Sequence, residues 1–221
     1  MARKKMKIVM LGEGRVGKTS LLHRFIHNKF DEECASTTKA NMYANTKIEV
    51  DDILADVSIW DTAGQERYHA LGPIYYRDAH GAVLAYDITD LESFERIKVW
   101  LKELHQVVGE SICVVVVGNK TDLERERKVN KKDAEDWAAQ NNAKHFLCSA
   151  KLGLRVSDAF HSLVQSIVRS DSTPSECNRN RFGSAEGSSR TTTTGTRSKG
   201  VKIAPTDEVP SRKTPGDSCA C

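Results

Sequence analysis

The sequence predicts an α/β domain of three layers, in which a mostly parallel sheet is covered by helices on both faces and carries one antiparallel pair of strands at an edge. Two observations support this prediction. Short, continuous apolar runs alternate with helical patterns, as expected of strands buried on both faces of a parallel sheet. One segment instead alternates apolar and polar residues, which is typical of a hairpin. In such sheets, ligands bind outside the carboxyl ends of the strands.

The expected strands follow from these patterns in chain order. Continuous apolar runs cover residues 7–11, 82–86 and 112–117, and a shorter run lies at 146–148. The alternating segments are residues 47–50 and 55–59, and Asp51 and Asp52 between them supply a hairpin turn.

The expected helices lie between these strands. A helical pattern begins at Ser20, and Thr89-Asp90-Leu91-Glu92 has the form of a capping box before a second helix. Asn130 is expected to cap a third helix, which carries Trp137. Apolar residues at helical spacing mark the buried face of the second helix at Phe94, Ile97, Leu101, Leu104 and Val108, and of the last helix at Val156, Phe160, Leu163, Val164 and Ile167.

Charge and composition divide the chain near residue 171. Residues 1–171 carry 25 basic and 25 acidic side chains, a balance that argues against a nucleic-acid partner. Residues 172–221 carry the whole excess of +3, and 16 of these 50 residues are Ser or Thr, so we expect a disordered tail. The apolar runs are too short to span a membrane, and the start of the chain argues against a secretion signal. The six cysteines are therefore expected to be free thiols.

The first functional motif directly follows the first expected strand. It reads Gly12-Glu13-Gly14-Arg15-Val16-Gly17-Lys18-Thr19 and matches the P-loop pattern G-x-x-x-x-G-K-[ST]. The glycines of such a loop let backbone N–H groups surround phosphate oxygens, and the following helix adds a positive dipole. Lys18 is expected to reach the β- and γ-phosphates, and the Thr19 hydroxyl to ligate Mg²⁺. The motif alone does not choose between ATP and GTP.

The second motif follows the second hairpin strand and reads Trp60-Asp61-Thr62-Ala63-Gly64-Gln65-Glu66. Asp61 therefore lies at the carboxyl end of a strand, where a carboxylate can hold Mg²⁺, usually through water. Gly64 offers a backbone N–H for a γ-phosphate. Gln65 is the expected catalytic residue, because its amide carries both a donor and an acceptor to orient an attacking water.

The third motif, Asn119-Lys120-Thr121-Asp122, ends the strand at 112–117. The Asp122 carboxylate can accept hydrogen bonds from the N1–H and the exocyclic amine of guanine. Adenine has no N1–H and would leave this carboxylate buried and unpaired, so the motif favours GTP. Ser149-Ala150-Lys151 follow another strand end and are expected to complete the base pocket.

On these motifs the chain resembles the Ras superfamily of small GTPases from Met6 to about Arg169. The Rab branch is indicated by Trp60-Asp61-Thr62-Ala63-Gly64-Gln65-Glu66-Arg67-Tyr68, Tyr75-Tyr76-Arg77-Asp78-Ala79 and Tyr86-Asp87-Ile88-Thr89. Similarity to the early-endosomal Rab-twenty-one subgroup is indicated by Gly12-Glu13-Gly14, His69-Ala70-Leu71-Gly72-Pro73-Ile74 and Lys144-His145-Phe146.

The resemblance implies a GTP-binding (G) domain over residues 1–171 with a six-stranded sheet, followed by a hypervariable tail over 172–221. It also implies a switch threonine that ligates Mg²⁺ with Thr19 and Asp61. Thr37 is the candidate, and Thr38 is the neighbouring alternative. Most Rabs follow this threonine with Ile-Gly and an aromatic, whereas here stand Thr38-Lys39 and Met42, on a surface that contacts effectors. The remaining nucleotide contacts implied by the family are Ser20, Phe30 and Leu123.

The resemblance extends to partners and location. The ending Cys219-Ala220-Cys221 resembles the Cys-X-Cys motif of Rabs that carry two geranylgeranyl groups, which attach the tail to a membrane. The implied partners are an exchange factor, a GTPase-activating protein, effectors, a GDP-dissociation inhibitor, and the Rab escort protein with its geranylgeranyl transferase. A monomer is expected on the cytoplasmic face of intracellular membranes, at early endosomes, with a cytosolic pool.

Two alternatives share part of this pattern. A P-loop ATPase or kinase would keep residues 12–19 but has no use for Asn119-Lys120-Thr121-Asp122 or a lipidated tail. A pseudo-GTPase that binds nucleotide without hydrolysis would lack Gln65 or Asp61, and both are present. We therefore expect a membrane-trafficking switch that recruits effectors when bound to GTP and hydrolyses GTP to GDP and phosphate.

Overall fold

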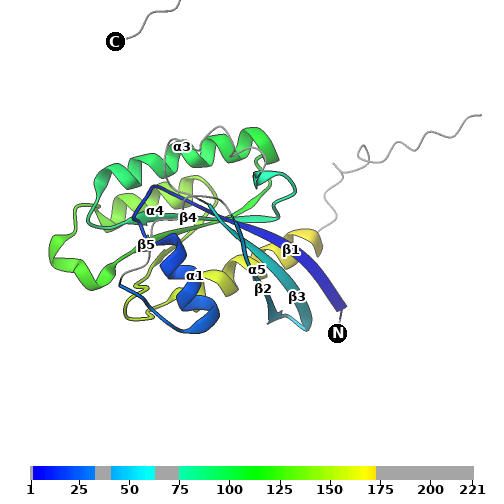
Figure 1. The fold of residues 1–221 in the computed structure, drawn as a ribbon. Coiled ribbons are helices and arrows are strands. Elements are labelled where there is room, and N and C mark those ends of the chain that lie inside the picture. Colours follow the sequence, from blue (N-terminus) through cyan, green and yellow to red (C-terminus); the bar gives the residue numbers. More distant parts are fainter. Residues whose placement is uncertain (1, 33–40, 63–74, 173–221) are drawn as a thin grey trace, which may run out of the picture. The chain divides into compact units, whose positions relative to one another are not determined.

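The sheet has the strand order β2-β3-β1-β4-β5-β6 in the computed structural model, which describes residues 2–32, 41–62 and 75–172 (Figure 1). All neighbouring strands pair in parallel except β2 and β3, which form an antiparallel pair at one edge. The mostly parallel six-stranded sheet is therefore confirmed. Its strands are β1 (Ala2–Leu11), β2 (Asn41–Val50), β3 (Ile53–Asp61), β4 (Gly81–Asp87), β5 (Cys113–Asn119) and β6 (Lys144–Leu147).

Helices cover both faces of this sheet. On one face lie α1 (Lys18–His27) and α5 (Val156–Ser172), and on the other lie α3 (Leu91–Val108) and α4 (Lys131–Gln140) (Figure 1). The central strands supply both apolar layers because successive side chains point to opposite faces. In β1, Ile8 and Met10 join the layer under α1 and α5, whereas Val9 and Leu11 join the layer under α3 and α4. The expected three-layer architecture is confirmed.

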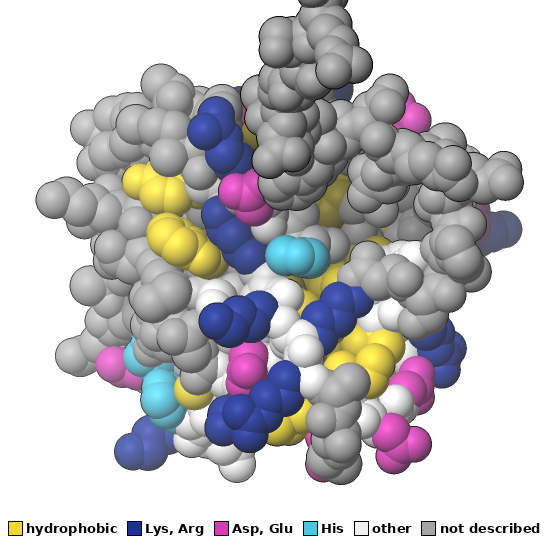
Figure 2. All heavy atoms as spheres, turned by 90° about the vertical axis from the view of Figure 1, so that its right-hand side faces the viewer, with side chains coloured by type: hydrophobic (Ala, Val, Ile, Leu, Met, Phe, Trp, Pro, Cys, Tyr) yellow, Lys and Arg dark blue, Asp and Glu magenta, His cyan; other side chains and the backbone are white. Residues whose placement is uncertain are grey.

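Strand β1 begins five residues earlier than its apolar run predicts. Residues 2–6 pair in parallel with β3, from Ala2 opposite Ile53 to Met6 opposite Val57. The backbone of β3 pairs with the backbone of this segment. Arg3, Lys4 and Lys5 therefore extend the strand although their side chains are polar. At this end of the domain, basic and acidic side chains are interspersed on the surface (Figure 2).

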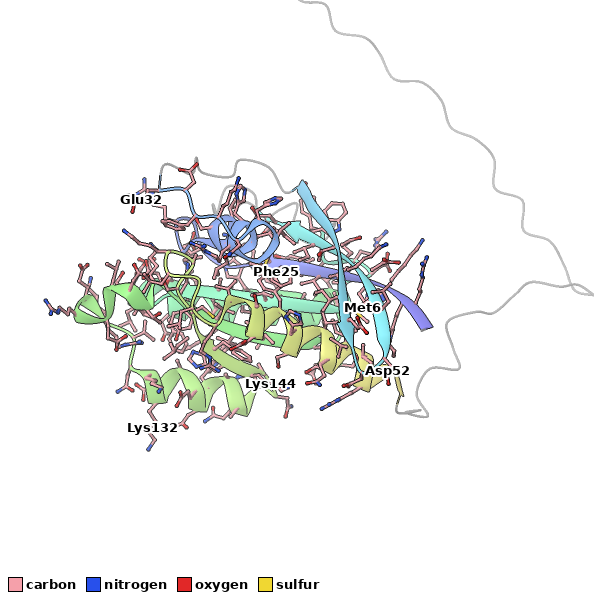
Figure 3. All side chains as sticks on the ribbon, turned by 90° about the horizontal axis from the view of Figure 1, so that it is seen from below. Met6, Phe25, Glu32, Asp52, Lys132 and Lys144 are labelled. Atoms are coloured by element: carbon pink, nitrogen blue, oxygen red, sulfur yellow. The ribbon has the colours of Figure 1, made fainter. Side chains whose placement is uncertain are left out.

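The hairpin turn has the expected position. Asp51 and Asp52 have φ values of 48° and 62°, and positive φ at both central residues is the requirement of a type I′ turn. The two aspartates also mark one end of the domain, and Figure 3 shows Asp52 and Glu32 at opposite ends.

The helix caps agree with the sequence in one case and differ in another. Asn130 caps α4 as predicted, and its side chain accepts a hydrogen bond from Lys132 N. Helix α3 is capped by Asp90, one residue later than the capping-box pattern predicts, and the Asp90 carboxylate accepts from Glu92 N at 3.0 Å. Thr89 instead donates from its backbone N–H and its hydroxyl to the Asp87 carboxylate.

Candidate functional site

Five parallel strands end at one edge of the sheet, and each is followed by residues that carry polar groups or glycine. Strands β1, β3, β4, β5 and β6 end at Leu11, Asp61, Asp87, Asn119 and Leu147. The described residues of the three predicted motifs therefore meet in space, as the rule for open α/β sheets requires.

Two glycines shape the P-loop between β1 and α1. A Cβ at Gly12 would collide with the carbonyl oxygen of Ala85 on β4. Gly17 is the N-cap of α1 with a φ of 92°, and a Cβ there would lie 2.5 Å from Asn119 Nδ2. Between them Arg15 is exposed and Val16 is buried. Larger residues at Gly12 or Gly17 would push the loop away from β4 and β5.

Lys18 is nearly enclosed by the P-loop. It is 6% exposed, and its Nζ donates to Gly12 O at 2.8 Å and to Glu13 O at 2.9 Å. Burial lowers the pKa of Lys18 to about 8, while the carboxylates of Asp61 and Glu13 act in the opposite direction. The buried ammonium is a local positive charge that attracts an anion strongly.

Thr19 and Asp61 meet at the same place from two different elements. The Thr19 hydroxyl lies in the first turn of α1 and donates to Asp61 Oδ2, at the end of β3, at a distance of 2.5 Å. Next to it, the Thr62 hydroxyl donates to Met10 O at 2.6 Å and ties the end of β3 to β1. A hydroxyl and a carboxylate offer the oxygen ligands that Mg²⁺ prefers, so the chemistry of the two side chains fits that ion.

Asn119 joins the P-loop to the 149–152 loop, which follows β6. Its Nδ2 donates to Val16 O at 2.8 Å, and its Oδ1 accepts from Ala150 N at 3.1 Å. The Asn119 side chain is 2% exposed, and both of its partners are also buried. One amide therefore fixes the spacing between the two loops.

Asp122 is fastened to the same 149–152 loop. Its Oδ1 accepts from the Ser149 hydroxyl at 2.5 Å, and that hydroxyl also accepts from Leu152 N at 3.0 Å. Leu123, next in the chain, is 37% exposed. The sequence-predicted Asp122 and Ser149 are thus brought into direct contact.

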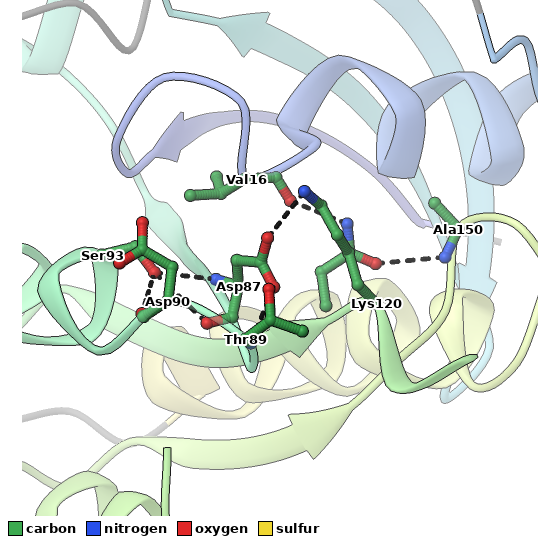
Figure 4. A network of polar contacts seen from close by, with 8 residues as sticks. Val16, Asp87, Thr89, Asp90, Ser93, Lys120 and Ala150 are labelled. Atoms are coloured by element: carbon green, nitrogen blue, oxygen red, sulfur yellow. Dashed lines mark hydrogen bonds and ion pairs between the residues drawn. The ribbon is translucent and has the colours of Figure 1, made fainter. Parts of the chain in front are cut away.

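Lys120 makes an ion pair that the sequence did not reveal. Its backbone is left-handed, with a φ of 67°, and its Nζ lies 2.6 Å from Asp87 Oδ2 at the end of β4 (Figure 4). The other oxygen of that carboxylate accepts from the backbone and the hydroxyl of Thr89. The same reasoning that selected Asp61, a carboxylate at the carboxyl end of a strand, would have found Asp87.

The structure also places the predicted residues Lys151 and Phe30. The exposed Lys151 Nζ is 2.6 Å from Glu32 Oε1, and this contact raises the pKa of Lys151. Phe30 is partly buried and packs against the apolar layer under α1 and α5.

A family model described as the Ras family matches residues 7–169. The chain belongs to the Ras family. Three relatives define its branch. Ras-related protein Rab-21 of Homo sapiens is 43% identical over 213 residues, which cover 96% of this chain and 89% of that protein. Rab-21 of Geodia cydonium is 46% identical over 76% of this chain and 72% of its own length. Rab-21 of Dictyostelium discoideum is 43% identical over 76% of this chain and 79% of its own length.

These relatives confirm the predicted Rab branch and the similarity to the Rab-21 subgroup. The chain is accordingly a small GTPase, an enzyme that hydrolyses GTP, and the family uses GTP and GDP together with Mg²⁺.

Several predicted residues of the Rab GTPase lie outside the described residues. They are Thr37 and its alternative Thr38, Gly64, the catalytic candidate Gln65, and the lipidation candidates Cys219 and Cys221. Their roles remain predictions. Within the described residues, every helix is too short or too polar to cross a lipid bilayer.

Proposed function

We propose that this Rab GTPase binds GTP and GDP at the carboxyl edge of its sheet and acts as a switch in membrane trafficking. The observation that carries the proposal is the Asn119 amide, which holds the P-loop and the 149–152 loop at a fixed spacing. A nucleotide needs such a spacing, because its phosphates and its base are recognised by different loops.

The phosphates belong at the P-loop. Backbone N–H groups of residues 13–20 and the N-terminus of α1 supply donors and a positive dipole there. Lys18 donates to two carbonyl oxygens within the loop and can turn the same ammonium to phosphate oxygens. Phosphate would compensate the burial that lowers the pKa of this lysine.

The metal belongs beside the phosphates. Thr19 and Asp61 would hold Mg²⁺, with Thr37 as a third ligand in the GTP state, and the ion neutralises charge on the phosphate oxygens when bound. Gly64 would meet the γ-phosphate and Gln65 would orient the attacking water. The γ-phosphate would order both switch segments, and effectors would recognise that ordered surface.

The guanine base belongs between Asn119-Lys120-Thr121-Asp122 and the 149–152 loop. Asp122 would accept from the base, and the Ser149 hydroxyl orients this carboxylate. Phe30, Leu123 and Lys151 would flank the ring. Lys120 is held by Asp87, so its aliphatic stem can cover one face of the base.

The experiment that tests this proposal replaces one carboxylate oxygen of Asp122 by an amide nitrogen. We expect Asp122→Asn to lower the affinity for GTP by about 100-fold or more and to raise the affinity for XTP, because the amide presents a donor where guanine also has donors. Competition binding measures both affinities. Asp133→Asn, at an exposed position of α4, is the matched control. An Asp122→Asn variant that prefers GTP over XTP as strongly as the parent would exclude this base site.

The proposal also covers the whole chain. A G domain over residues 1–171 would be followed by a flexible tail whose Cys219 and Cys221 carry two geranylgeranyl groups. One lipid chain binds a membrane only weakly, so the pair would supply stable attachment. The proposed location is the cytoplasmic face of early endosomes with a cytosolic pool. The partners proposed from the family are an exchange factor, a GTPase-activating protein, effectors, a GDP-dissociation inhibitor and the prenylation machinery.

A further inference from the structure

One arginine of α1 reaches across to the 149–152 loop. Arg24 Nε donates to Ala150 O at 2.8 Å, and its Nη2 donates to Lys151 O at 2.8 Å. Its remaining nitrogen, Nη1, donates to Asn28 O at 2.8 Å and to Asn28 Oδ1 at 3.2 Å. All three nitrogens of the guanidinium are therefore engaged, two of them by consecutive carbonyls of the 149–152 loop.

These contacts complete a set that holds the 149–152 loop from several sides. The backbone of Ala150 donates from its N–H to Asn119, and its carbonyl accepts from Arg24. Ser149 is held by Asp122 through its hydroxyl. Asn119 and Asp122 belong to the predicted guanine motif, whereas Arg24 comes from α1 and belongs to none of the motifs.

The surroundings suit an arginine at this position. Gly153 has a φ of 71°, and a Cβ there would come within 3.4 Å of Arg24 Cδ, so the side chain passes closely over this glycine. Arg24 also lies in the last turn of α1, where a cation is favoured by the helix dipole. A planar guanidinium can donate to several acceptors in one fixed geometry, which the single ammonium of lysine does not reproduce.

We propose that Arg24 is a positioning residue that sets how long guanine nucleotide stays bound. This inference rests on the proposed placement of the base against the 149–152 loop. Departure of the base requires that loop to move, and movement breaks the bonds from Arg24 to Ala150 and Lys151. Through Asn28, the same side chain also ties the loop to the segment that follows α1.

The test measures nucleotide release from the full-length chain loaded with radiolabelled GDP and Mg²⁺. We expect Arg24→Ala to release GDP at least about tenfold faster than the parent, because it loses charge-assisted hydrogen bonds. Arg24→Met keeps the apolar stem without donors and is expected to match Arg24→Ala. Arg24→Lys is expected to lie between them and the parent. Arg169→Ala, which removes an arginine bonded to Asp51 at the opposite end of the domain, is the matched control and should release GDP like the parent.

A second readout separates positioning from general support of the fold. IDP lacks the exocyclic amine that Asp122 would recognise, so the ratio of IDP to GDP release rates reports on the placement of the base pocket. We expect this ratio to shrink toward one in Arg24→Ala, whereas a uniform loss of stability would speed the release of both nucleotides by the same factor. If Arg24→Ala does not fold in excess GDP, Arg24→Met and Arg24→Lys decide the question in the same way.

The inference is overturned if the folded Arg24 variants release GDP at the parent rate, or if they release GDP and IDP faster by the same factor. The release rates of IDP and GDP from the parent test the proposed function itself. A parent that releases IDP as slowly as GDP contradicts the proposed base site, whereas a selective parent with unchanged Arg24 variants contradicts only the role of Arg24.

Discussion

Glu13 places a negative charge inside the loop that is proposed to bind phosphate. One oxygen of its carboxylate accepts from Gly14 N at 3.2 Å, and the other lies 3.7 Å from Arg96 Nε on α3. An uncompensated carboxylate at this position would repel the nucleotide. Arg96 therefore offsets a charge that the P-loop motif does not require.

We predict that Arg96→Ala weakens the affinity for both GDP and GTP by roughly two- to fivefold at low salt. The effect should be modest because the arginine side chain is 42% exposed and the contact is long. It should shrink as the salt concentration rises. Equilibrium titration with each nucleotide at two ionic strengths measures this loss.

A second substitution makes the Arg96 prediction specific. Glu13→Gln removes the charge that Arg96 offsets, so the double variant should bind GDP more tightly than Arg96→Ala alone. Arg3→Ala, an exposed position at the other end of β1, is the control and should keep the parent affinity. Losses that simply add in the double variant would show that the two side chains are not coupled.

At the level of the elements, β4 and β6 are joined across β5 by a pair of rings. The Tyr86 hydroxyl lies 2.9 Å from His145 Nε2, and the two rings stack with their centroids 6.0 Å apart. Gly118 of β5 makes this possible, because a Cβ there would lie 2.5 Å from the Tyr86 hydroxyl. The edge strand β6 is thus fastened to the second strand inward as well as to its neighbour.

This pairing predicts an acid-sensitive contribution to stability. Burial lowers the pKa of His145 to about 4, whereas the pKa of an unfolded histidine is about 6.5. Between these values the unfolded chain binds more protons than the folded chain, so the contribution is present above the unfolded pKa and is lost as the pH falls toward 4. The charges that act on His145 are Glu135, which raises its pKa, and Arg127, Lys131 and Arg155, which lower it.

Urea unfolding of the parent and of His145→Gln at fixed excess GDP and Mg²⁺ measures this contribution. We expect the free energy of unfolding to fall less steeply between pH 6.5 and 5 in His145→Gln than in the parent. His27→Gln changes an exposed histidine and should keep the slope of the parent. Identical slopes for the parent and His145→Gln would rule out a partly buried histidine that stays neutral in this pH range.

The elements differ in how far the sequence predicts them. Strands β4 and β5 are buried on both faces, so their apolar runs mark them directly. The start of β1 is polar and is held by backbone pairing with β3, which composition does not reveal. The cap of α3 lies one residue later than predicted: the Asp90 carboxylate accepts from Glu92 N, while Thr89 is bonded to Asp87, and the residue pattern does not distinguish the two arrangements.

The same distinction applies to the site. Lys18, Asn119 and Asp122 lie in motifs whose residue types reflect their chemistry, and the structure brings them to one edge. Arg24 gives no such signal, because its acceptors are backbone carbonyls 126 and 127 residues away. A carbonyl has the same chemistry at every position, so only the fold shows which one an arginine meets.

For the whole molecule, we predict that the nucleotide site and the membrane anchor are separable. A chain that ends at residue 172 should bind GDP with the affinity of the parent and melt at the same temperature, because α5 is complete there. In cells it should be soluble, as should the full-length double variant Cys219→Ser, Cys221→Ser. Fractionation and GDP titration measure the two properties.

A shorter truncation provides the control for this prediction. Ending the chain at residue 163 removes Val164, Ile167 and Val168, which are buried in the layer under α1 and α5. That chain should lose both stability and GDP binding. Weak GDP binding by the chain that ends at residue 172 would show that the tail is part of the nucleotide-binding unit.

The hydrogen bonds of the Asn119 amide also determine when the nucleotide pocket can form during synthesis of the chain. Its two partners, Val16 and Ala150, are separated from it by 103 and 31 residues, so the P-loop leaves the ribosome long before the loop that completes the pocket. A nascent chain that has exposed the whole P-loop still has no place for a base until β5 and β6 have joined the sheet. Because α5 must also pack before the domain is stable, capture of a guanine nucleotide follows the delivery of both the pocket and α5, and the ligand stabilises only chains that have reached that length.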